Sequence, residues 1–385
     1  MLVLAGLAII FAYVRAGQFR QLLLPYRLLV VATGAWLLVA TIWSFLSPSP
    51  LESLSVVKRD ILTSMLAFMV FYALTRTRAD MMRWISVLTG GLVILTVMIV
   101  REPFDPQATL QESDYLTVGL LTTWIVTVAP LLTMSLFADR RWRSRALFLS
   151  VVSLLCLLVS AWLSGNRTVW ICFAAMVVIA TVFGGRSVQS IRLRWRGAAI
   201  VLVLLAVLAS FMFAAMQFRA RTQAPAGTGP LTFLLNDNRA PILQVAFEMI
   251  RERPLAGRGY DNPEIGDIFA ARFETPWLRN YVHQAHNIVL NYALQMGVTG
   301  AIVILGLFAA LAWTFLKRLP TGGLARLAGL CGIALVTGVF LRNMTDDFFS
   351  RHTVQFFGAA AGMLLGLATH RPPLRLSSAK AIPAN

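Results

Sequence analysis

The chain has 385 residues, of which 58% are hydrophobic and only 13% are charged, whereas soluble domains carry about 25% charged residues. Its mean hydropathy is +0.71. This composition excludes a soluble globular domain and predicts an all-α polytopic membrane protein. The formal net charge of +17 does not point to a nucleic-acid partner, because the basic residues gather in short turns between apolar runs.

Apolar runs recur along the whole chain and predict eleven membrane-spanning helices. They cover residues 1–14, 28–47, 61–75, 84–100, 116–137, 147–163, 168–184, 198–217, 287–316, 324–341 and 354–369. The first run has no basic segment before it and no small-residue cleavage site behind it, so we expect no cleavable signal peptide. The three cysteines lie inside apolar runs, which predicts buried thiols and no disulfide framework.

Arginine and lysine residues concentrate in every second connection between these runs. By the positive-inside rule such connections face the cytoplasm, and anionic lipid of the inner leaflet also favours them. The N-terminus and segment 218–285 are then expected on the opposite, outer face of the membrane. The basic residues concerned are Arg15, Arg20, Arg27, Arg76, Arg78, Arg83, Arg140, Arg141, Arg143, Arg145, Arg186, Arg192, Arg194, Arg196, Lys317, Arg318, Arg326, Arg371, Arg375 and Lys380.

Segment 218–285 is the one long polar segment between predicted spans, and connections of this length are usually functional. Apolar positions with helical spacing predict a helix over 240–251, ended by Pro254 and a sharp turn at 257–259. The sequence therefore predicts four parts. These are N-terminal membrane helices (1–217), a large, partly helical periplasmic loop (218–285), C-terminal membrane helices (286–370) and a cytoplasmic tail (371–385).

His286 lies where the long polar loop meets the next apolar run. A neutral imidazole at such an aqueous boundary is suited to accept a proton from an attacking hydroxyl, and the N-terminus of a helix disfavours the imidazolium. The alternative is an interfacial histidine that only caps the helix. His283 precedes it by one helical turn, but no third ligand has suitable spacing, so we expect no metal site.

Four arginines lie on the predicted outer side, near span ends or in the loop: Arg167, Arg239, Arg258 and Arg342. The planar guanidinium group suits phosphate oxygens, and arginine at the depth of a membrane is usually paired or functional. The alternative for each is a salt bridge or a side chain that extends to water. Arg167 has the least freedom, because it ends a four-residue link between two spans.

Asp346 and Asp347 form an adjacent acidic pair near the outer end of the predicted tenth span. Their carboxylates are suited to orient a histidine or to hold an arginine; the alternative is an exposed loop pair. The sequence has no Asp-x-Asp metal–nucleotide motif, no phosphate-binding glycine loop and no Gly-x-Ser-x-Gly elbow. We therefore expect no nucleotide or other cofactor.

The sequence His286-Asn287, nine further residues and then Gly297-Val-Thr-Gly300 resembles the signature of bacterial O-antigen ligases. Residues 253–259, Arg-Pro-Leu-Ala-Gly-Arg-Gly, are similar to a run shared by the wider superfamily of O-antigen ligases and polymerases. Arg167 matches the arginine that these proteins carry ahead of their long outer loop. The resemblance implies a GT-C-like glycosyltransferase architecture, usually with twelve spans, so we expect the first family helix to be missing here.

The resemblance implies transfer of an O-antigen glycan from undecaprenyl pyrophosphate to a sugar hydroxyl of lipid A–core, at the periplasmic face. The reaction would be a metal-independent direct displacement with inversion, since pyrophosphate is already a good leaving group. His286 would be the general base, and Arg167 and Arg239 would bind the pyrophosphate, with Arg258 as a weaker candidate. Asn287 or Asp347 would orient the histidine, and His283 and Arg342 are secondary candidates.

Two other enzymes of this kind use the same donor: an O-antigen polymerase and a protein O-oligosaccharyltransferase. The Gly-x-x-Gly spacing after His-Asn favours the ligase. A polysaccharide or lipid transporter is the alternative without chemistry. It is disfavoured because the sequence shows no internal repeat and the candidate residues gather at one face.

Overall fold

The computed structural model of the chain describes residues 8, 26–101, 118–133, 143–164, 166–184, 206, 207, 209, 210, 212–214, 239–274, 279, 282–321 and 323–369. The described residues form helices, turns and connecting loops, without a β-strand. The predicted spans 1–14 and 198–217 lie mostly outside this part of the chain, and the tail 371–385 lies wholly outside it. The all-α fold class is confirmed, and the total of eleven spans stays a prediction.

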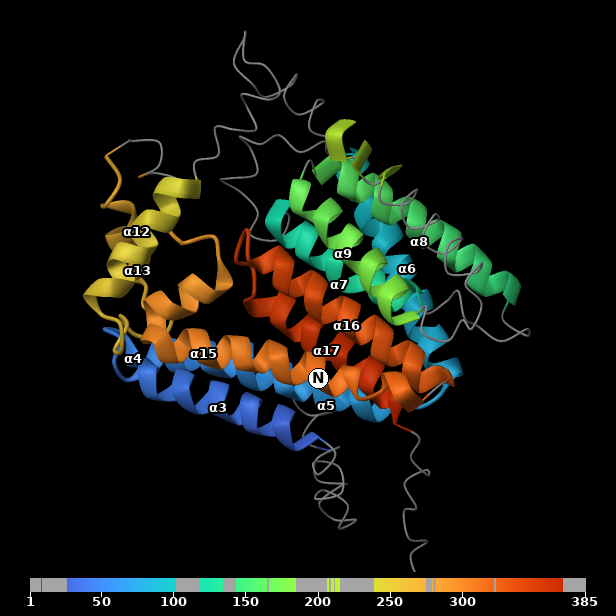
Figure 1. The fold of residues 1–385 in the computed structure, drawn as a ribbon, viewed down its shortest axis with the longest axis horizontal. Helices are drawn as coiled ribbons and strands as arrows, with labels where there is room; N and C mark the ends of the chain where they lie inside the picture. The colour runs from blue at the N-terminus through green and yellow to red at the C-terminus, as the bar shows by residue number, and fades with distance from the viewer. Residues whose placement is uncertain are drawn as a thin grey trace, which may run out of the picture.

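The other predicted spans each coincide with a helix (Figure 1). Among the described residues, five helices, α3, α6, α8, α15 and α16, are long and apolar enough to cross a membrane, and α7 and α9 are shorter apolar helices. In chain order the elements are α3 (Arg27–Ser44), α4 (Pro50–Val56), η2 (Val57–Leu62, a π-helix), α5 (Thr63–Leu74), α6 (Arg78–Arg101), α7 (Val118–Thr133), α8 (Arg143–Ser164), α9 (Arg167–Gly184), α12 (Arg239–Glu252), α13 (Glu264–Ala270), α15 (Ile288–Leu316), η6 (Leu319–Thr321, a 3-10 helix), α16 (Gly323–Asn343) and α17 (Arg351–Ala368).

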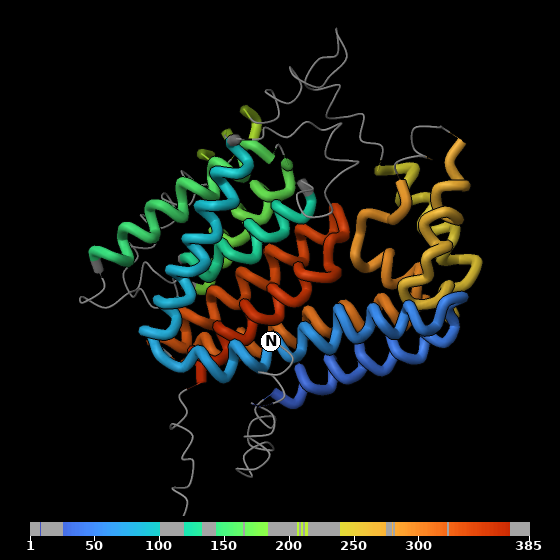
Figure 2. Tube along the Cα trace, turned by 180° about the vertical axis from the view of Figure 1, so that it is seen from behind, coloured from blue at the N-terminus to red at the C-terminus, as the bar shows by residue number. Residues whose placement is uncertain are grey.

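Helices α5 and α17 pack closely because one face of α17 carries glycine every fourth residue. A Cβ atom added at Gly358, Gly362 or Gly366 would overlap carbonyl oxygens of α5, so only a residue without a side chain permits this approach. Ser64 of α5 also donates a hydrogen bond to the carbonyl oxygen of Val354, at 3.0 Å. The two helices thus form a tight pair, which is seen side by side in Figure 2.

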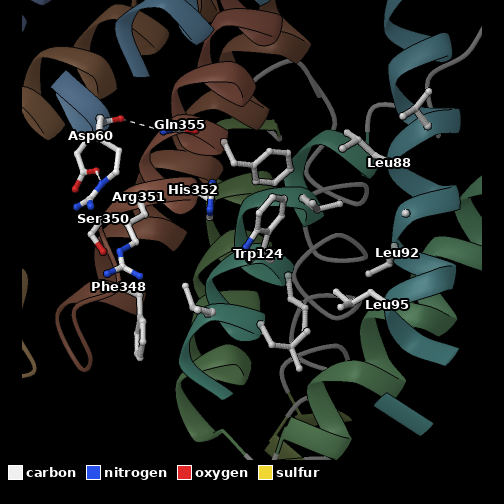
Figure 3. A pocket seen from close by; sticks show the side chains of 18 of the residues that line it. Asp60, Leu88, Leu92, Leu95, Trp124, Phe348, Ser350, Arg351, His352 and Gln355 are labelled. Atoms are coloured by element: carbon white, nitrogen blue, oxygen red, sulfur yellow. Dashed lines mark hydrogen bonds and ion pairs between the residues drawn. The ribbon is translucent and has the colours of Figure 1, made fainter. Parts of the chain in front are cut away.

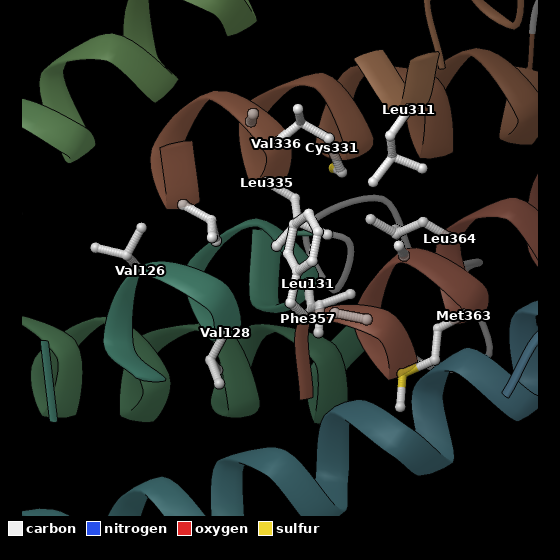
Figure 4. Close-up of a cluster of buried hydrophobic side chains, with 14 of the residues drawn as sticks. Val126, Val128, Leu131, Leu311, Cys331, Leu335, Val336, Phe357, Met363 and Leu364 are labelled. Carbon is white, nitrogen blue, oxygen red and sulfur yellow. The ribbon is translucent and has the colours of Figure 1, made fainter. Parts of the chain in front are cut away.

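A pocket of about 1020 Å³ lies between α6, α7 and the start of α17 (Figure 3). The main apolar core lies beside this pocket, where α7, α15, α16 and α17 meet (Figure 4). Leu131, Leu335 and Leu364 are fully buried there. The buried core and the exposed leucine and valine side chains of α6 and α8 together suit a bundle surrounded by lipid.

Helices α12 and α13 lie at one end of the molecule, beside the start of α15 (Figure 1). The predicted helix 240–251 is confirmed as α12, and the predicted apolar stripe is its buried face. This face packs in a second, smaller core with α13 and the first turns of α15. Its members are Ile242, Val245, Ala246, Met249, Phe269, Phe273, Val282, Ala285 and Leu294.

A break in α15 at Gly297 joins this outer region to the bundle. Gly297 has φ 64° and ψ −162°, a conformation that only glycine adopts at low cost. The turn at 254–259 fills the break: Arg258 N–H donates to the Leu294 carbonyl at 3.0 Å, and Val298 N–H donates to the Pro254 carbonyl at 2.7 Å. The backbone groups freed by the kink are therefore satisfied by the turn.

We predict that Gly297→Ala destabilises the protein, because the added Cβ would lie 2.5 Å from the carbonyl oxygens of Pro254 and Leu255. Positive φ alone costs a non-glycine residue about 1–3 kcal/mol, so a fall in Tm of about 5 °C or more is expected. Thermal unfolding of the purified protein in detergent measures it. Gly306→Ala in the same helix is the control, since its Cβ would meet no atom within 4 Å. Equal Tm values for the two variants would contradict the role of the kink.

Candidate functional site

The loop before α15 places His286 and Asn287 at the N-terminus of that helix. Asn287 is the N-cap: its side-chain oxygen accepts hydrogen bonds from Val289 N–H (3.0 Å) and Leu290 N–H (3.1 Å), which is what a capping asparagine does. Its side-chain amide donates to the carbonyl of Met344 at 3.1 Å. Asn287 thus connects the start of α15 to the loop between α16 and α17.

His286 contacts a carboxylate from that same loop. Its Nδ1 lies 2.8 Å from Oδ1 of Asp346. Because an ionised carboxylate can only accept, Nδ1 is the protonated nitrogen of the neutral ring, and Nε2 carries the lone pair. The imidazole is therefore oriented by Asp346, while Asp347, expected from the sequence as the orienting group, contacts another residue.

Asp346 lies between His286 and a completely buried arginine. Its second oxygen, Oδ2, is 3.3 Å from Nη2 of Arg342, whose side chain has no exposed surface. Burial acts to raise the pKa of Asp346, but the hydrogen bond from His286 and the positive charge of Arg342 outweigh it and lower the pKa below the ordinary value. Asp346 is therefore ionised at neutral pH.

Arg342 is held by three further acceptors. Its Nε donates to the hydroxyl of Thr122 at 2.8 Å, and Nη2 donates to the carbonyl of Gly119 at 3.2 Å, both on α7. Nη1 donates to the backbone carbonyl of Asp346 at 3.3 Å. A buried guanidinium is tolerated only when it is paired in this way, so Arg342 positions Asp346 and does not extend to water.

Asp347 is bonded to the first turn of α15 through Asn291. The Asn291 amide donates to Oδ2 of Asp347 at 2.8 Å, and its side-chain oxygen accepts from Ala285 N–H at 2.8 Å. Burial raises the pKa of Asp347. Sequence reasoning missed Asn291, Thr122 and Gly119. The one signal available for Asn291 is its position four residues after Asn287, on the same face of the helix.

Arg167 and Arg239 begin two different helices that approach this loop. Arg167 is half-buried at the start of α9, and the next residue, Thr168, accepts a hydrogen bond from Thr345 at 3.0 Å. Arg239 is exposed at the start of α12 and lies near enough for its charge to act on Arg342. Two of the predicted phosphate-binding arginines thus lie around the His286–Asp346–Arg342 network.

The structure gives Arg258 and His283 other surroundings. Arg258 is 10% exposed and pairs with Glu252, which also pairs with Arg272, so Arg258 belongs to the turn that fills the kink in α15. His283 is exposed and lies against Gly266 of α13. Within the described residues, no group of three or more histidine, cysteine, aspartate or glutamate side chains is placed to hold a metal ion.

The model of one protein family, described as O-antigen ligase, matches residues 152–305. This part of the chain is similar to the O-antigen ligase family. The matched region begins in α8 and contains Arg167, Arg239, His286 and the kink at Gly297, so the motifs recognised in the sequence lie inside it. No curated protein matches the chain. Asp346 and Arg342 lie beyond the matched region, although Asp346 contacts the histidine inside it.

We predict that Asp346→Asn lowers the stability of the protein by about 3 kcal/mol at neutral pH, because it leaves the buried Arg342 without its counter-charge. A carboxylate with a lowered folded-state pKa contributes stability above its unfolded pKa of about 3.9, and loses it as the pH falls through the folded value. Thermal unfolding from pH 7 to pH 3 measures this. The Tm difference between wild type and variant should shrink below about pH 4. A constant difference would contradict a contribution from the charge of Asp346.

Proposed function

We propose that the protein transfers an O-antigen glycan from undecaprenyl pyrophosphate to a sugar hydroxyl of lipid A–core. The match to the O-antigen ligase family supports ligase- or polymerase-type glycan transfer, and the apolar helices support a multi-pass membrane protein. The observation that carries the proposal is the His286–Asp346 pair at the start of α15, within hydrogen-bonding distance at 2.8 Å.

In the proposed reaction the acceptor hydroxyl oxygen attacks the anomeric carbon of the donor glycan. Nε2 of His286 accepts the hydroxyl proton as the new carbon–oxygen bond forms. The bond from the anomeric carbon to the pyrophosphate oxygen breaks, and its electron pair leaves with the pyrophosphate. One displacement of this kind inverts the anomeric centre. The negative charge of Asp346 stabilises the imidazolium that results.

Two arginines supply the positive charge that the leaving pyrophosphate requires. Arg167 and Arg239 come from the starts of α9 and α12 and lie around the same network as His286. Guanidinium groups bind phosphate oxygens with two parallel hydrogen bonds, and fixed charges beside a leaving group stabilise the transition state. Charge stabilisation in the proposed reaction thus comes from protein side chains.

The reaction is proposed for the periplasmic face of the bacterial inner membrane. The support is the charge pattern of the chain. Helix α6 has Arg76, Arg78 and Arg83 at its N-terminal end. Helix α15 has His286 just before its first residue and Lys317 and Arg318 just after its last. By the positive-inside rule those basic ends face the cytoplasm. His286 then lies on the side where lipid-linked glycans are used.

The acceptor distinguishes the ligase from its nearest alternatives. The purified protein is reconstituted with one polyprenyl-linked glycan and three separate acceptors: lipid A–core, a second carrier-linked unit and a pilin-like protein, with a chelator present throughout. We expect glycan on lipid A–core. Transfer only to the carrier-linked unit would make the protein a polymerase, and transfer only to the pilin would make it a protein O-oligosaccharyltransferase.

We predict that His286→Ala abolishes this transfer, because it removes Nε2, the proposed acceptor of the hydroxyl proton. General-base catalysis contributes about 10²–10⁴-fold, so product formation should fall by at least that range. The measurement is product per amount of folded protein. His283→Ala, three residues earlier and exposed, is the matched control and should retain transfer. Retained transfer in His286→Ala would remove the assignment of the base.

We predict that Arg167→Ala and Arg239→Ala weaken donor use, and that lysine at either position restores it only poorly, because lysine lacks the planar fork. The dependence of the transfer rate on donor concentration measures this. Arg272→Lys is the control: Arg272 is an arginine of the same outer segment that pairs with Glu252, and the variant should behave as wild type. Full activity of both lysine variants would show that only a point charge is needed.

A further inference from the structure

The pocket between α6, α7 and α17 has the shape and lining of a site for an amphipathic molecule. Its volume of about 1020 Å³ is at the upper end of the range for small-molecule sites, about 300–1,000 Å³. Val87 lines it and is 66% exposed, so the pocket opens at the surface of the bundle. The apolar walls come from α6 and α7, with Phe356 of α17. They are Val87, Leu88, Leu92, Leu95, Leu120, Leu121, Trp124, Ile125 and Val128.

The other end of the pocket is polar and carries charges of both signs. Arg59 and Arg351 supply two guanidinium groups, and Asp60 and Asp261 supply two carboxylates. Figure 3 shows Asp60, Ser350 and Arg351 gathered on one side, with Leu88, Leu92 and Leu95 of α6 on the other. The polar groups lie where η2 and α17 begin, at the same end of the bundle as the loop of Asp346.

The carboxylate of Asp261 lies near enough to Arg59 and Arg351 for their charges to act on it. The backbone N–H of Asp261 donates to the side chain of Gln295 at 3.0 Å, but within the described part of the chain no hydrogen bond reaches its carboxylate. Removal of water around the carboxyl and the charge of neighbouring Asp60 raise the pKa of Asp261 to about 6. Such a group favours a cation or a strong hydrogen-bond donor from a ligand.

Arg351 and the N-terminus of α17, which it begins, suit a negatively charged group. Arg351 lies in the first turn of α17, and the N-terminus of an 18-residue helix carries partial positive charge that binds phosphate groups. Arg59 approaches from η2, where Asp60 accepts from its Nε at 2.8 Å. Arg351 and Asp261 both have positive φ, 48° and 46°, and the one other described non-glycine residue with positive φ is His286. Strain of this kind persists at sites where a side chain must point in one direction.

The pocket is separate from the proposed reaction site. Phe348 lines the pocket, and its ring lies 5.5 Å from the guanidinium carbon of Arg342. The ring also covers Gly119, where an added Cβ would overlap it. One aromatic side chain therefore stands between the pocket and the Arg342–Asp346–His286 network. A ligand with several negative charges and no positive one would meet the carboxylates of Asp60 and Asp261.

From this lining we infer that the pocket is a binding site for a zwitterionic phospholipid of the surrounding bilayer, of the phosphatidylethanolamine class. The acyl chains lie along α6 and α7, the phosphate lies between Arg351 and Arg59, and the ammonium lies beside Asp261. Such a head group carries a phosphate for the two arginines and an ammonium for the carboxylates, whereas a polyprenyl phosphate offers only the phosphate. This inference does not depend on the glycan acceptor.

The test uses a glycine that lines the pocket. Gly91→Leu places a side chain in the pocket, and an added Cβ there meets no atom within 4 Å. Gly90→Leu is the matched control: Gly90 also meets no atom within 4 Å but does not line the pocket. The purified full-length protein is exchanged into micelles with equal amounts of phosphatidylethanolamine, phosphatidylglycerol and undecaprenyl phosphate. Native mass spectrometry then counts the lipid that each variant retains.

We expect wild type and Gly90→Leu to retain phosphatidylethanolamine in preference to the other two lipids, and Gly91→Leu to retain about tenfold less, which equals a loss of about 1.4 kcal/mol of binding free energy. Asp261→Asn should keep lipid bound but lose the preference for phosphatidylethanolamine over phosphatidylglycerol. Equal retention by Gly91→Leu and Gly90→Leu would overturn the site. A wild-type preference for phosphatidylglycerol or undecaprenyl phosphate would overturn the assigned head group.

Discussion

The buried ion pair between Arg342 and Asp346 is the interaction on which the rest of the site depends. A guanidinium without exposed surface requires a counter-charge, and Asp346 supplies it while its other oxygen holds Nδ1 of His286. The same carboxylate therefore neutralises the buried charge of Arg342 and orients the candidate base, His286. Removal of this carboxylate would leave Arg342 without a counter-charge and His286 without its orienting acceptor. We therefore expect stability and the proposed glycan transfer to depend on the same residue.

The kink at Gly297 explains why two sequence motifs that are far apart occur together. The Pro-Leu-x-Gly-x-Gly turn and the Gly-x-x-Gly segment are separate motifs in the sequence, but their backbones hydrogen-bond to each other. Trp43 of α3 also donates to the carbonyl of Ala256 at 2.6 Å, so the turn is held from two sides. The motifs thus set the position of the outer helices, α12 and α13, over the start of α15.

The loop between α16 and α17 serves two neighbouring environments. Asp346 and Asp347 point to the start of α15, through His286 and Asn291, while Phe348 and Arg351 face the pocket beside α6. A lipid held in that pocket would contact the same short loop that orients His286. The proposed lipid site therefore gives the bilayer a direct contact with the loop of the reaction site.

The sequence by itself determined the helical class, the positions of the described apolar helices and helix α12, and it showed the likeness of residues 152–305 to O-antigen ligases, because hydrophobic periodicity and short motifs are local properties. It also singled out His286, Arg167 and Arg239, whose roles stay predictions. Only the tertiary structure decided which of two adjacent aspartates meets His286, that Arg258 pairs with Glu252, and that Arg342 points inward to α7. These contacts join residues up to 223 positions apart, and they depend on helix packing and loop direction, which no local pattern encodes.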